Sequence, residues 1–565
     1  MVKGKWFFVC MALSAMFCAN VAAEEIEYLN ATPLTDVVNA RSGNVEASGK
    51  LLVPVITWGG DVSAIYTHSE GIFKENGLEV ELFLENNFPK QVEAALSGKT
   101  PYIRGTMGMV NQAVEVFHRE GQDLVVVYQL TWSSGGDVMV VRDNIKTPAD
   151  LRGKTIALQY NGPHMDYLAN VLKSAGVSLS EVKFRYLREL TLPTTDTAGK
   201  VVDSVSAFQN DPSIDAVMVI SPDASLLTSG GKVGTGAEGS VKGARALLST
   251  KTASKIIADV YAVRRDYFES HKDEVERFVR SLIRGQDKLR EFLKNKNRDQ
   301  SKYAQLTSRA AFLLLGSPQA TADVEGLLGD CEFVDASGNE AFFTGKGTTR
   351  SFVNLIDEIQ TSFTAMHLMS DRAILRSADW DFAALSGGSN TAKSEPSKPK
   401  FDQEKIEAEA ANFSLDGTLF VKEIFFKPNQ NDFVESEYAK DFAEALKTAE
   451  TYEGAIVIIE GHADPEGIRR AKKRNENAAV IAQMEQQVKN LSLLRSREVL
   501  KSFMGYCKSH GYSLDESRFV AVGMGIKSPK YPEPVSKDQW LQNMRVAFRI
   551  KQIEAEMSEF TAEEK

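Results

Sequence analysis

Apolar runs of strand length alternate with helical segments through the first half of this chain, and no other feature limits its fold as strongly. The run Leu51–Thr57 is continuously apolar, which is typical of a strand buried in a parallel sheet. A helical segment over 63–73 follows and ends near a glycine stop. Strands separated by helices form a mostly parallel sheet, so the sequence predicts an α/β fold. Further strands are expected at 78–84, 124–128, 138–141, 155–158, 182–186 and 216–220.

The length of the chain and a change in composition divide it into several domains. A chain of 565 residues is too long for one hydrophobic core, so we expect two to four domains. Residues 272–294 have the spacing of an amphipathic helix. A later stretch rich in Gly, Ser, Thr and Pro is typical of a linker. The expected division is a leader segment at 24–49, a front domain at 50–385, a linker at 386–412, a last domain at 413–553 and a tail at 554–565.

Residues 1–23 have the composition of a secretory signal. Lys3 and Lys5 precede a short apolar run, and Val21-Ala-Ala23 supplies the small residues of a cleavage site. The run is too short to span a bilayer comfortably, and no later run of about 18 or more apolar residues follows it. A retained membrane anchor is the alternative. The sequence therefore predicts an exported protein.

Charge and cysteine content exclude several classes of function. The formal net charge of -10 would repel phosphates, so we expect no nucleic-acid partner. Cys331 and Cys507 remain after removal of the signal, and two distant cysteines predict neither a disulfide nor a metal cluster. Glu460, His462 and Asp464 alternate onto one strand face as metal ligands do, but no further cluster supports a metal. We expect no metal, no other cofactor and no catalytic residue.

Several short segments of the front domain resemble a known family. They are Trp58-Gly-Gly60, Gly71–Val80, Ala95–Gly98, Ser133–Asp137, Thr147–Thr155 and Ile257–Asp266, which together cover roughly residues 50–300. In order and composition they are similar to the periplasmic substrate-binding proteins of ABC importers, in the nitrate, sulfonate and thiamine-precursor branch. The resemblance implies two α/β lobes that close on a small solute, with an ABC permease as partner.

The same resemblance implies where the solute would bind. Lobe 1 would comprise 50–137 and 256–385, and lobe 2 would comprise 138–255. Ligands of open α/β sheets bind beyond the carboxyl ends of the strands, where loops lead into helix N-termini. The loops in those positions supply the expected solute-binding residues Trp58, Gly59, Gly60, Asp61, Thr106, Gly108, Trp132, Ser133, Tyr160, Asn161 and His164.

Several of these residues have a purely structural alternative. Trp58 and Trp132 could be core aromatics, and Asp61 could cap a helix. His164 could be a surface residue near a helix start. The three glycines favour close approach of a ligand to the backbone, because they carry no side chain. Together, the aromatic rings, hydroxyls and helix N-termini suit a small anion with an apolar or ring portion.

The last domain carries a second resemblance. The segment Ile456–Asp464 places a strand of branched residues directly before the cluster Gly-His-Ala-Asp. An opening strand at 419–426, a glycine turn at 522–525 and the segment Asn543–Val546 accompany it. This combination resembles the OmpA-like peptidoglycan-binding domain, which implies a smaller α/β domain of β-α-β-α-β type.

The second resemblance also assigns roles to single residues. Asp464 would bind the ammonium and Arg495 the carboxylate of the diaminopimelate side chain in peptidoglycan, with Asn543 and Arg545 near the pocket. Arginine suits this role because its planar fork pairs with both carboxylate oxygens. A proline follows Asp464, so this residue could instead cap a helix.

A polar and basic insert, Ile468–Lys489, separates Asp464 from Arg495. One unbroken helix over that interval would hold the two residues roughly 45 Å apart, at about 1.5 Å per residue. They could then not share a ligand. We therefore predict that the insert leaves the domain and returns, with a new helix that starts near Asn490.

These features lead to three hypotheses. The first is a non-enzymatic protein of the periplasm and cell envelope, which binds a small solute with its front domain and peptidoglycan with its last domain. The second is a sensory or scaffolding protein whose front domain does not serve a transporter. The third is an envelope enzyme, which the lack of a recognisable nucleophile or metal set makes the weakest of the three.

Overall fold

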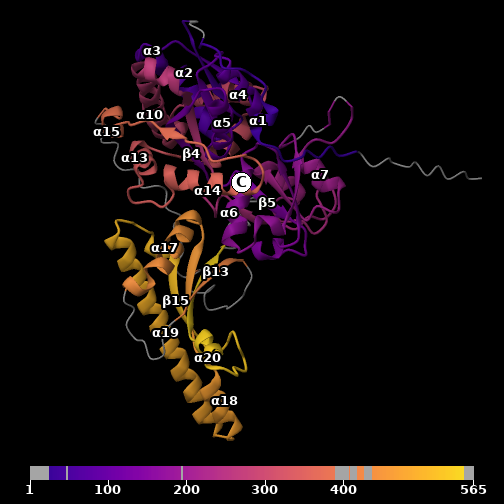
Figure 1. The fold of residues 1–565 in the computed structure, drawn as a ribbon, viewed down its shortest axis with the longest axis vertical. Helices are drawn as coiled ribbons and strands as arrows, with labels where there is room; N and C mark the ends of the chain where they lie inside the picture. The colour runs from indigo at the N-terminus through magenta and orange to yellow at the C-terminus, as the bar shows by residue number, and fades with distance from the viewer. Residues whose placement is uncertain are drawn as a thin grey trace, which may run out of the picture.

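The computed structural model describes residues 25–45, 49–191, 195–196, 198–387, 406, 417–425 and 435–552. The predicted signal, the predicted tail and nearly all of the predicted linker lie outside these ranges. The part up to residue 387 forms one body, and the part from residue 417 extends from its lower side (Figure 1). Within the described ranges, no helix combines the length and the apolar character needed to cross a membrane.

Lobe 1 is built on two small sheets. β1 and β2 pair in parallel, while β10 runs antiparallel between β3 and β4. The predicted parallel arrangement is therefore limited in this lobe, because the chain returns from lobe 2 along β10. The strands are β1 (Leu51–Val55), β2 (Val80–Leu84), β3 (Tyr102–Thr106), β4 (Leu124–Ser133), β10 (Ala258–Arg264), β11 (Cys331–Phe333) and β12 (Arg376–Ser377).

Helices of lobe 1 follow the apolar spacing of the sequence. The amphipathic pattern at 272–294 forms α10, whose Phe278 is buried and stacks on Phe73 at 5.7 Å between ring centroids. The helices are α1 (Leu34–Val37), α2 (Val62–Ser69), α3 (Ile72–Glu75), α4 (Phe88–Leu96), α5 (Met107–Arg119), α9 (Arg265–Ser270), α10 (Lys272–Lys294), α11 (Gln300–Leu315), α12 (Thr321–Gly329), α13 (Ala336–Thr344), α14 (Phe352–Ala365) and α15 (Phe382–Leu385).

Lobe 2 has one five-stranded sheet in the order β7-β6-β8-β5-β9. β6 pairs in parallel with β7 and β8, and β5 pairs antiparallel with β8 and β9. The elements are β5 (Asp137–Val141), η2 (Pro148–Leu151), β6 (Thr155–Gln159), α6 (His164–Ser174), β7 (Lys183–Leu187), α7 (Ser204–Asn210), β8 (Ala216–Ile220), α8 (Ser221–Leu227) and β9 (Arg245–Ser249).

Two chain segments connect the lobes. One leads from β4 into β5 through residues 134–136, and the other leads from β9 into β10 through residues 250–257. Ser133 Oγ lies 2.8 Å from Thr250 Oγ1, and the Gly135 amide donates to the same oxygen at 3.0 Å. These bonds hold the two crossings side by side, so they form the hinge between the lobes.

The segment expected to be a leader is packed on the front domain where the structure describes it. Leu29 forms a bridge to Tyr186 of lobe 2. Leu34 and Val38 are fully buried, and the short helix α1 lies against α5 of lobe 1. Residues 25–45 therefore contribute to the front core through a few apolar side chains in a mainly polar segment.

The rear domain has a four-stranded sheet in the order β13-β16-β14-β15. β14 and β15 are parallel, and β16 runs antiparallel to β13 and β14. The long helix α19 packs along β14 and β15. The elements are β13 (Thr418–Phe425), α17 (Glu435–Thr451), β14 (Ile456–His462), α18 (Glu466–Lys473), α19 (Ala478–Ser509), β15 (Phe519–Gly525), α20 (Lys537–Asn543) and β16 (Arg545–Lys551).

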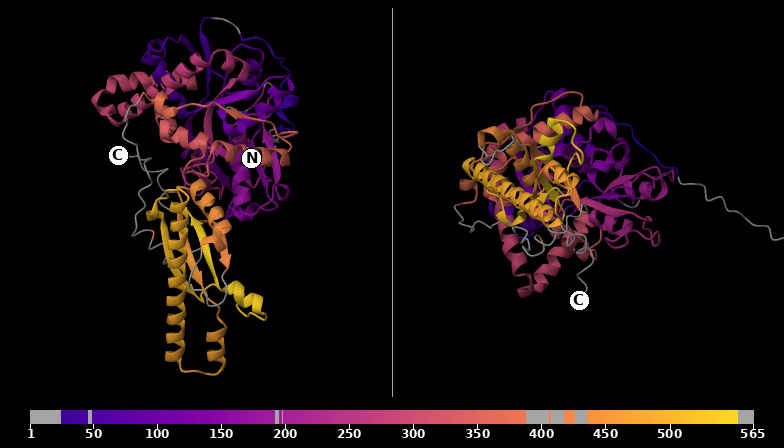
Figure 2. Two further views of the ribbon diagram at one scale, coloured as in Figure 1. Left: turned by 60° about the vertical axis from the view of Figure 1, so that its left-hand side comes forward. Right: turned by 90° about the horizontal axis from the view of Figure 1, so that it is seen from below.

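The insert in the rear domain leaves and returns, as predicted. α18 and the first part of α19 are the two arms of a helical hairpin that projects away from the front domain (Figure 2). Asn475 adopts a positive φ of 53° in the turn, and the Asn477 side chain caps α19 by accepting from the Ala479 amide at 2.8 Å. Lys472 and Glu485 join the arms at 2.9 Å.

The predicted helix start near Asn490 is wrong. α19 runs without a break from Ala478 through this position, and the Gln486 side chain donates to Asn490 Oδ1 at 2.8 Å. The residues that precede Asn490 include many strong helix formers, so the returning arm is helical from the tip of the hairpin onward.

Candidate functional site

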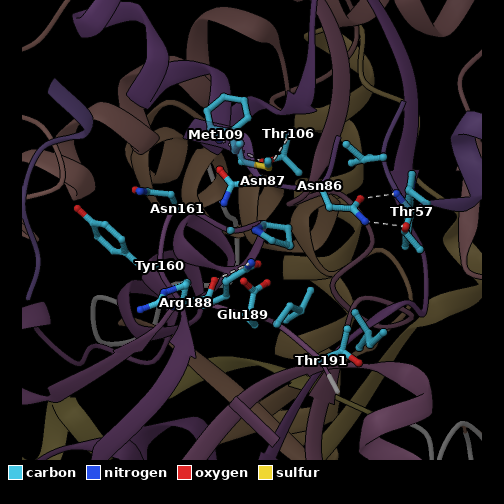
Figure 3. Close-up of a pocket in the computed structure, with 18 of the residues that line it drawn as sticks. Thr57, Asn86, Asn87, Thr106, Met109, Tyr160, Asn161, Arg188, Glu189 and Thr191 are labelled. Carbon is cyan, nitrogen blue, oxygen red and sulfur yellow. Dashed lines mark hydrogen bonds between the residues drawn. The ribbon is translucent and has the colours of Figure 1, made fainter. Parts of the chain in front are cut away.

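A cavity of about 790 Å³ lies between the two lobes. Lobe 1 contributes the loops after β1 and β2 and the start of α5, and lobe 2 contributes the loops after β6, β7 and β8. These are the carboxyl ends of the strands, where such sheets bind ligands. Figure 3 shows side chains from both lobes around this space.

Two helix N-termini open onto the cavity. Asn87 begins α4 and accepts a hydrogen bond from the Lys90 amide at 3.1 Å. Thr106 begins α5 and accepts from the Met109 amide at 3.2 Å. Both capping residues line the cavity, and the positive end of a helix dipole favours an anionic group nearby.

Trp58 lines the cavity in an orientation that its neighbours determine. Its indole Nε1 donates to Thr131 Oγ1 at 3.0 Å. Gly136 lies against the ring, and a Cβ at that position would be 2.6 Å from two ring carbons. Trp58 is also largely buried, so it is both a core aromatic and part of the cavity wall.

Tyr160 and Asn161 line the cavity from lobe 2. The Tyr160 hydroxyl accepts from the Thr32 amide at 3.0 Å, which joins the segment before lobe 1 to this wall. Asn161 is buried with a positive φ of 56°, and its Oδ1 has no hydrogen-bond partner in the part of the chain that the structure describes. A buried acceptor on a cavity wall is a natural contact for a ligand donor.

Asp61 lies behind the cavity wall in a buried charge network. Arg104 donates to its carboxylate at 2.8 Å and to Asp259 at 2.9 Å, and all three side chains are almost fully buried. Burial raises the pKa of Asp61 to about 6, although the charge of Arg104 acts in the opposite direction. The predicted helix-cap role is not observed, because the side chain pairs with Arg104.

The three predicted glycines approach protein atoms instead of the cavity. A Cβ on Gly59 would lie 1.9 Å from the Leu327 carbonyl oxygen, and one on Gly108 would lie 2.7 Å from Asp166 Oδ1. Gly60 lies against the side chain of a β4 residue. The sequence predicts close approach of a ligand to these glycines, whereas the structure places α12, α6 and β4 against them.

Trp132, Ser133 and His164 lie at the hinge rather than on the cavity. Trp132 packs edge-to-face against Phe342, with ring centroids 5.9 Å apart. His164 Nε2 and Ser133 Oγ bind the two carboxylate oxygens of Asp137, at 2.6 Å and 2.5 Å. His164 is fully buried, so it is not the surface residue considered as its alternative.

The strand-end rule could also have identified further lining residues. Asn86 and Asn87 follow β2, and Arg188 and Glu189 follow β7, each at the carboxyl end of its strand. Asp330 carries no such signal, since it follows a helix far along the chain.

Asp330 connects the two lobes across the cavity. Ser221 at the start of α8 in lobe 2 donates to Asp330 Oδ2 at 2.7 Å. Burial raises the pKa of Asp330 to about 6, and the nearby charge of Asp137 acts in the same direction. Asp330 can therefore accept a hydrogen bond from the N–H group of a ligand at the point where the two lobes meet.

In the rear domain, both carboxylate oxygens of Asp464 accept hydrogen bonds. Its Oδ1 accepts from the Glu466 amide at 2.9 Å near the start of α18. Its Oδ2 accepts from Asn543 Nδ2 at 3.0 Å, and Asn543 also binds the backbone of Tyr531 on both its N–H and C=O. Asn543 therefore orients Asp464 and ties it to the loop after β15.

Arg495 comes from the part of α19 that packs on the ends of β14 and β15. One turn before it, Ser492 accepts from the Gly525 amide at 2.9 Å, and Gly525 accepts from the Ala463 amide at 2.9 Å. Arg495 is half-buried, and its Nε has no hydrogen-bond partner among the described residues. Burial lowers the pKa of this guanidinium.

Arg545 and Glu460 are held by other partners. Arg545 pairs with Glu423 at 2.7 Å. Glu460 binds Arg549 through both oxygens, at 2.7 Å and 2.8 Å, and lies 3.3 Å from His462 Nε2. Burial alone would raise the pKa of Glu460, but these partners lower it to about 2. No group of three metal-type side chains is found in the described ranges.

Comparison with known proteins finds one family model that matches part of the chain. Residues 62–291 match the model described as NMT1/THI5 like. The matched range begins at α2 and ends within α10, and it does not include the rear domain. No curated protein matches the chain.

Solved structures that resemble the chain cover its front part. The alkanesulfonate-binding protein SsuA from Xanthomonas axonopodis pv. citri, bound to MOPS, is 16% identical over 59% of this chain and 100% of its own, with a TM-score of 0.39. SsuA from Escherichia coli, a periplasmic aliphatic sulphonate binding protein, is 16% identical over 58% and 90%, with a TM-score of 0.38. The desulfurization enzyme DSZB is 14% identical over 57% and 94%, with a TM-score of 0.34. Similarity at this level does not transfer a ligand or an activity.

Proposed function

We propose that this chain is an exported, non-enzymatic protein of the cell envelope with two binding sites. The front domain binds a small solute between its lobes, as the substrate-binding component of an ABC importer does. The rear domain binds the diaminopimelate side chain of peptidoglycan. The observation that carries the front proposal is the cavity of about 790 Å³, because both lobes line it at the carboxyl ends of their strands.

The cavity wall favours a particular kind of solute. Trp58 and Tyr160 supply aromatic surface, and the starts of α4 and α5 favour an anionic group. Asn161 Oδ1 and Asp330 are acceptors that suit an N–H donor. A small molecule with an acidic group, a ring or apolar portion and a nitrogen donor satisfies all of these features.

Calorimetry on the full chain tests the front site. The titrants are small sulfonates and carboxylates, each in a matched form with and without an amino group. Saturable binding by at least one pair is expected, with weaker binding in Trp58→Ala and in Asp330→Asn. Phe312→Ala serves as the control, since this ring is exposed on α11 outside the cavity. Failure of every class of titrant would contradict a solute site.

The rear proposal rests on the contrast between two side chains. Asp464 presents a carboxylate oriented by Asn543, and Arg495 presents a half-buried guanidinium whose Nε finds no partner in the described ranges. A half-buried arginine costs free energy unless an anion binds it. The zwitterion of diaminopimelate offers a carboxylate for Arg495 and an ammonium for Asp464.

Binding to purified cell-wall sacculi tests the rear site. We expect Asp464→Ala and Arg495→Ala to remain in the supernatant where the unmodified chain sediments with the wall. Arg497→Ala is the matched control, because this arginine is exposed two residues further along the same helix. Equal retention of all three variants would contradict the assignment.

A further inference from the structure

One turn of the rear domain lies against the back of the front domain. This turn, residues 447–455, connects the end of α17 to the start of β14. It contacts three parts of the front domain, namely α14, α6 and the crossing segment 250–257. The contacts include hydrogen bonds and ion pairs.

The first set of contacts holds the turn to α14. Glu450 accepts a hydrogen bond from the Thr349 amide at 2.7 Å, just before α14. Lys447 forms an ion pair with Glu358, and Glu358 also binds Arg350 at 2.9 Å. α14 belongs to lobe 1, and it packs against α5 of lobe 1 and against α6 of lobe 2.

The second set of contacts holds the rear domain to lobe 2. The Tyr452 hydroxyl lies 3.4 Å from Asn170 Oδ1 on α6. β13 of the rear sheet lies against η2 of the same lobe. The rear domain therefore touches both lobes on the side away from the cavity.

The third set of contacts holds the hinge itself. The Gly454 amide donates to the Thr252 carbonyl at 3.1 Å, and a Cβ on Gly454 would lie 2.0 Å from the Lys251 carbonyl oxygen. Lys255 of the same crossing pairs with Glu332 of lobe 1 at 2.6 Å and with Glu453 of the turn at 3.6 Å. The crossing segment is thus held between the lobes and the rear domain.

We propose that the docked rear domain acts as a clamp on the hinge and couples the angle between the lobes to its own position. Two lobes joined by crossing segments reorient by rotation about those segments. A rigid rear domain cannot follow both lobes in such a rotation, so one of its two sets of lobe contacts must break. Docking therefore favours the lobe angle at which Ser221 reaches Asp330 across the cavity.

This inference rests on the proposed solute site, and it adds regulation to that site. Because coupling between two binding events is reciprocal, a solute that changes the lobe angle also changes the docking of the wall-binding domain. The front domain would then report solute to a domain anchored in the wall. The hypothesis of a sensory protein requires this kind of coupling between solute binding and a second domain.

The test measures the lobe angle directly and needs no solute. Spin labels at Lys288→Cys in lobe 1 and Lys232→Cys in lobe 2, both exposed, report the distance between the lobes. The chain carries Cys331→Ala and Cys507→Ala to avoid other labelling. Lys447→Glu, Glu450→Lys and Gly454→Ala are combined to replace the ion pair with Glu358, the hydrogen bond from Thr349 and the close approach to the 250–257 crossing. Small-angle scattering verifies that the rear domain is released.

We expect one narrow distance distribution in the docked chain and a shifted or broadened one after release. Gly505→Ala is the control, since a Cβ there would meet no described atom within 4 Å. A released rear domain with an unchanged distance distribution would overturn the clamp. A triple variant that stays docked in scattering would overturn it as well, because the contacts of the turn with α14 and with the crossing segment would then not be what holds the rear domain on the hinge. Neither result would affect the solute site, which calorimetry tests independently.

Discussion

The surroundings of the front cavity and of Arg495 in the rear domain differ in how charge is paired. Beside the front cavity, the buried carboxylates of Asp61 and Asp259 pair with Arg104 inside the protein. In the rear domain, Arg495 is half-buried while its Nε has no partner within the described ranges. Removal of one partner from a buried ion pair destabilises a fold. A half-buried cation that lacks a full set of partners favours the binding of an anion from outside. We therefore expect the network of Asp61, Arg104 and Asp259 to serve the fold, and Arg495 to serve binding.

The largest expected effect comes from breaking the front network. Arg104→Met would leave two buried carboxylates without their counterion, which costs about 3–5 kcal/mol. We expect the front domain to unfold at a lower denaturant concentration, as followed by tryptophan fluorescence. Arg497→Met on the exposed face of α19 should change stability by less than about 0.5 kcal/mol. Similar losses in both variants would remove the contrast between the domains.

The two regions should also differ in the sign of their pH dependence. Burial raises the pKa of Asp330 to about 6 and that of Asp166 to about 7 in the front domain. A raised pKa contributes stability that is present below the unfolded value near 4 and is lost as the pH rises through 6 to 7. Glu460 of the rear domain, with a pKa of about 2, contributes stability above about 4.5 that is lost as the pH falls through 2.

Calorimetric scans between pH 2 and pH 8 measure this difference. Asp166→Asn should reduce the pH dependence of the front domain's unfolding temperature between pH 4 and pH 7. Glu460→Gln should reduce the loss of rear-domain stability at low pH. Glu460→Gln should also lower rear stability at pH 7 by about 1.5–3 kcal/mol, because it weakens the charged bonds to Arg549. If both domains shifted in the same direction with pH, the proposed distinction would fail.

An apolar substitution at Arg495 should separate stability from binding. Arg495→Leu removes a half-buried cation that burial alone perturbs, so we expect stability to rise by about 1 kcal/mol. The same variant should lose binding to sacculi. Arg497→Leu should change neither quantity appreciably. A loss of stability in Arg495→Leu would mean that the guanidinium serves the fold, as Arg104 does.

The comparison also explains how far the sequence could predict each site. Asp464 follows a recognisable strand in a contiguous motif, so local sequence predicts its place just after β14. The rule that ligands bind at strand ends predicts that Trp58 and Tyr160 line the cavity, as the structure shows. Asp330 lies on the cavity only because tertiary folding brings a loop after α12 against lobe 2. Asp61 forms a buried ion pair with Arg104, and no spacing in the sequence predicts that pair.

The helical hairpin offers the smallest test, and its two asparagines should respond with opposite signs. Asn477 caps α19, so Asn477→Ala should lower stability by about 1 kcal/mol. Asn490 lies inside the same helix, where alanine has the higher helix propensity, so Asn490→Ala should raise stability by a few tenths to about 0.5 kcal/mol. If α19 instead started at Asn490, the larger loss would move to that residue. Urea unfolding of the two variants measures both signs, and it determines whether Arg495 stands near the start of a short helix or deep within the long helix α19.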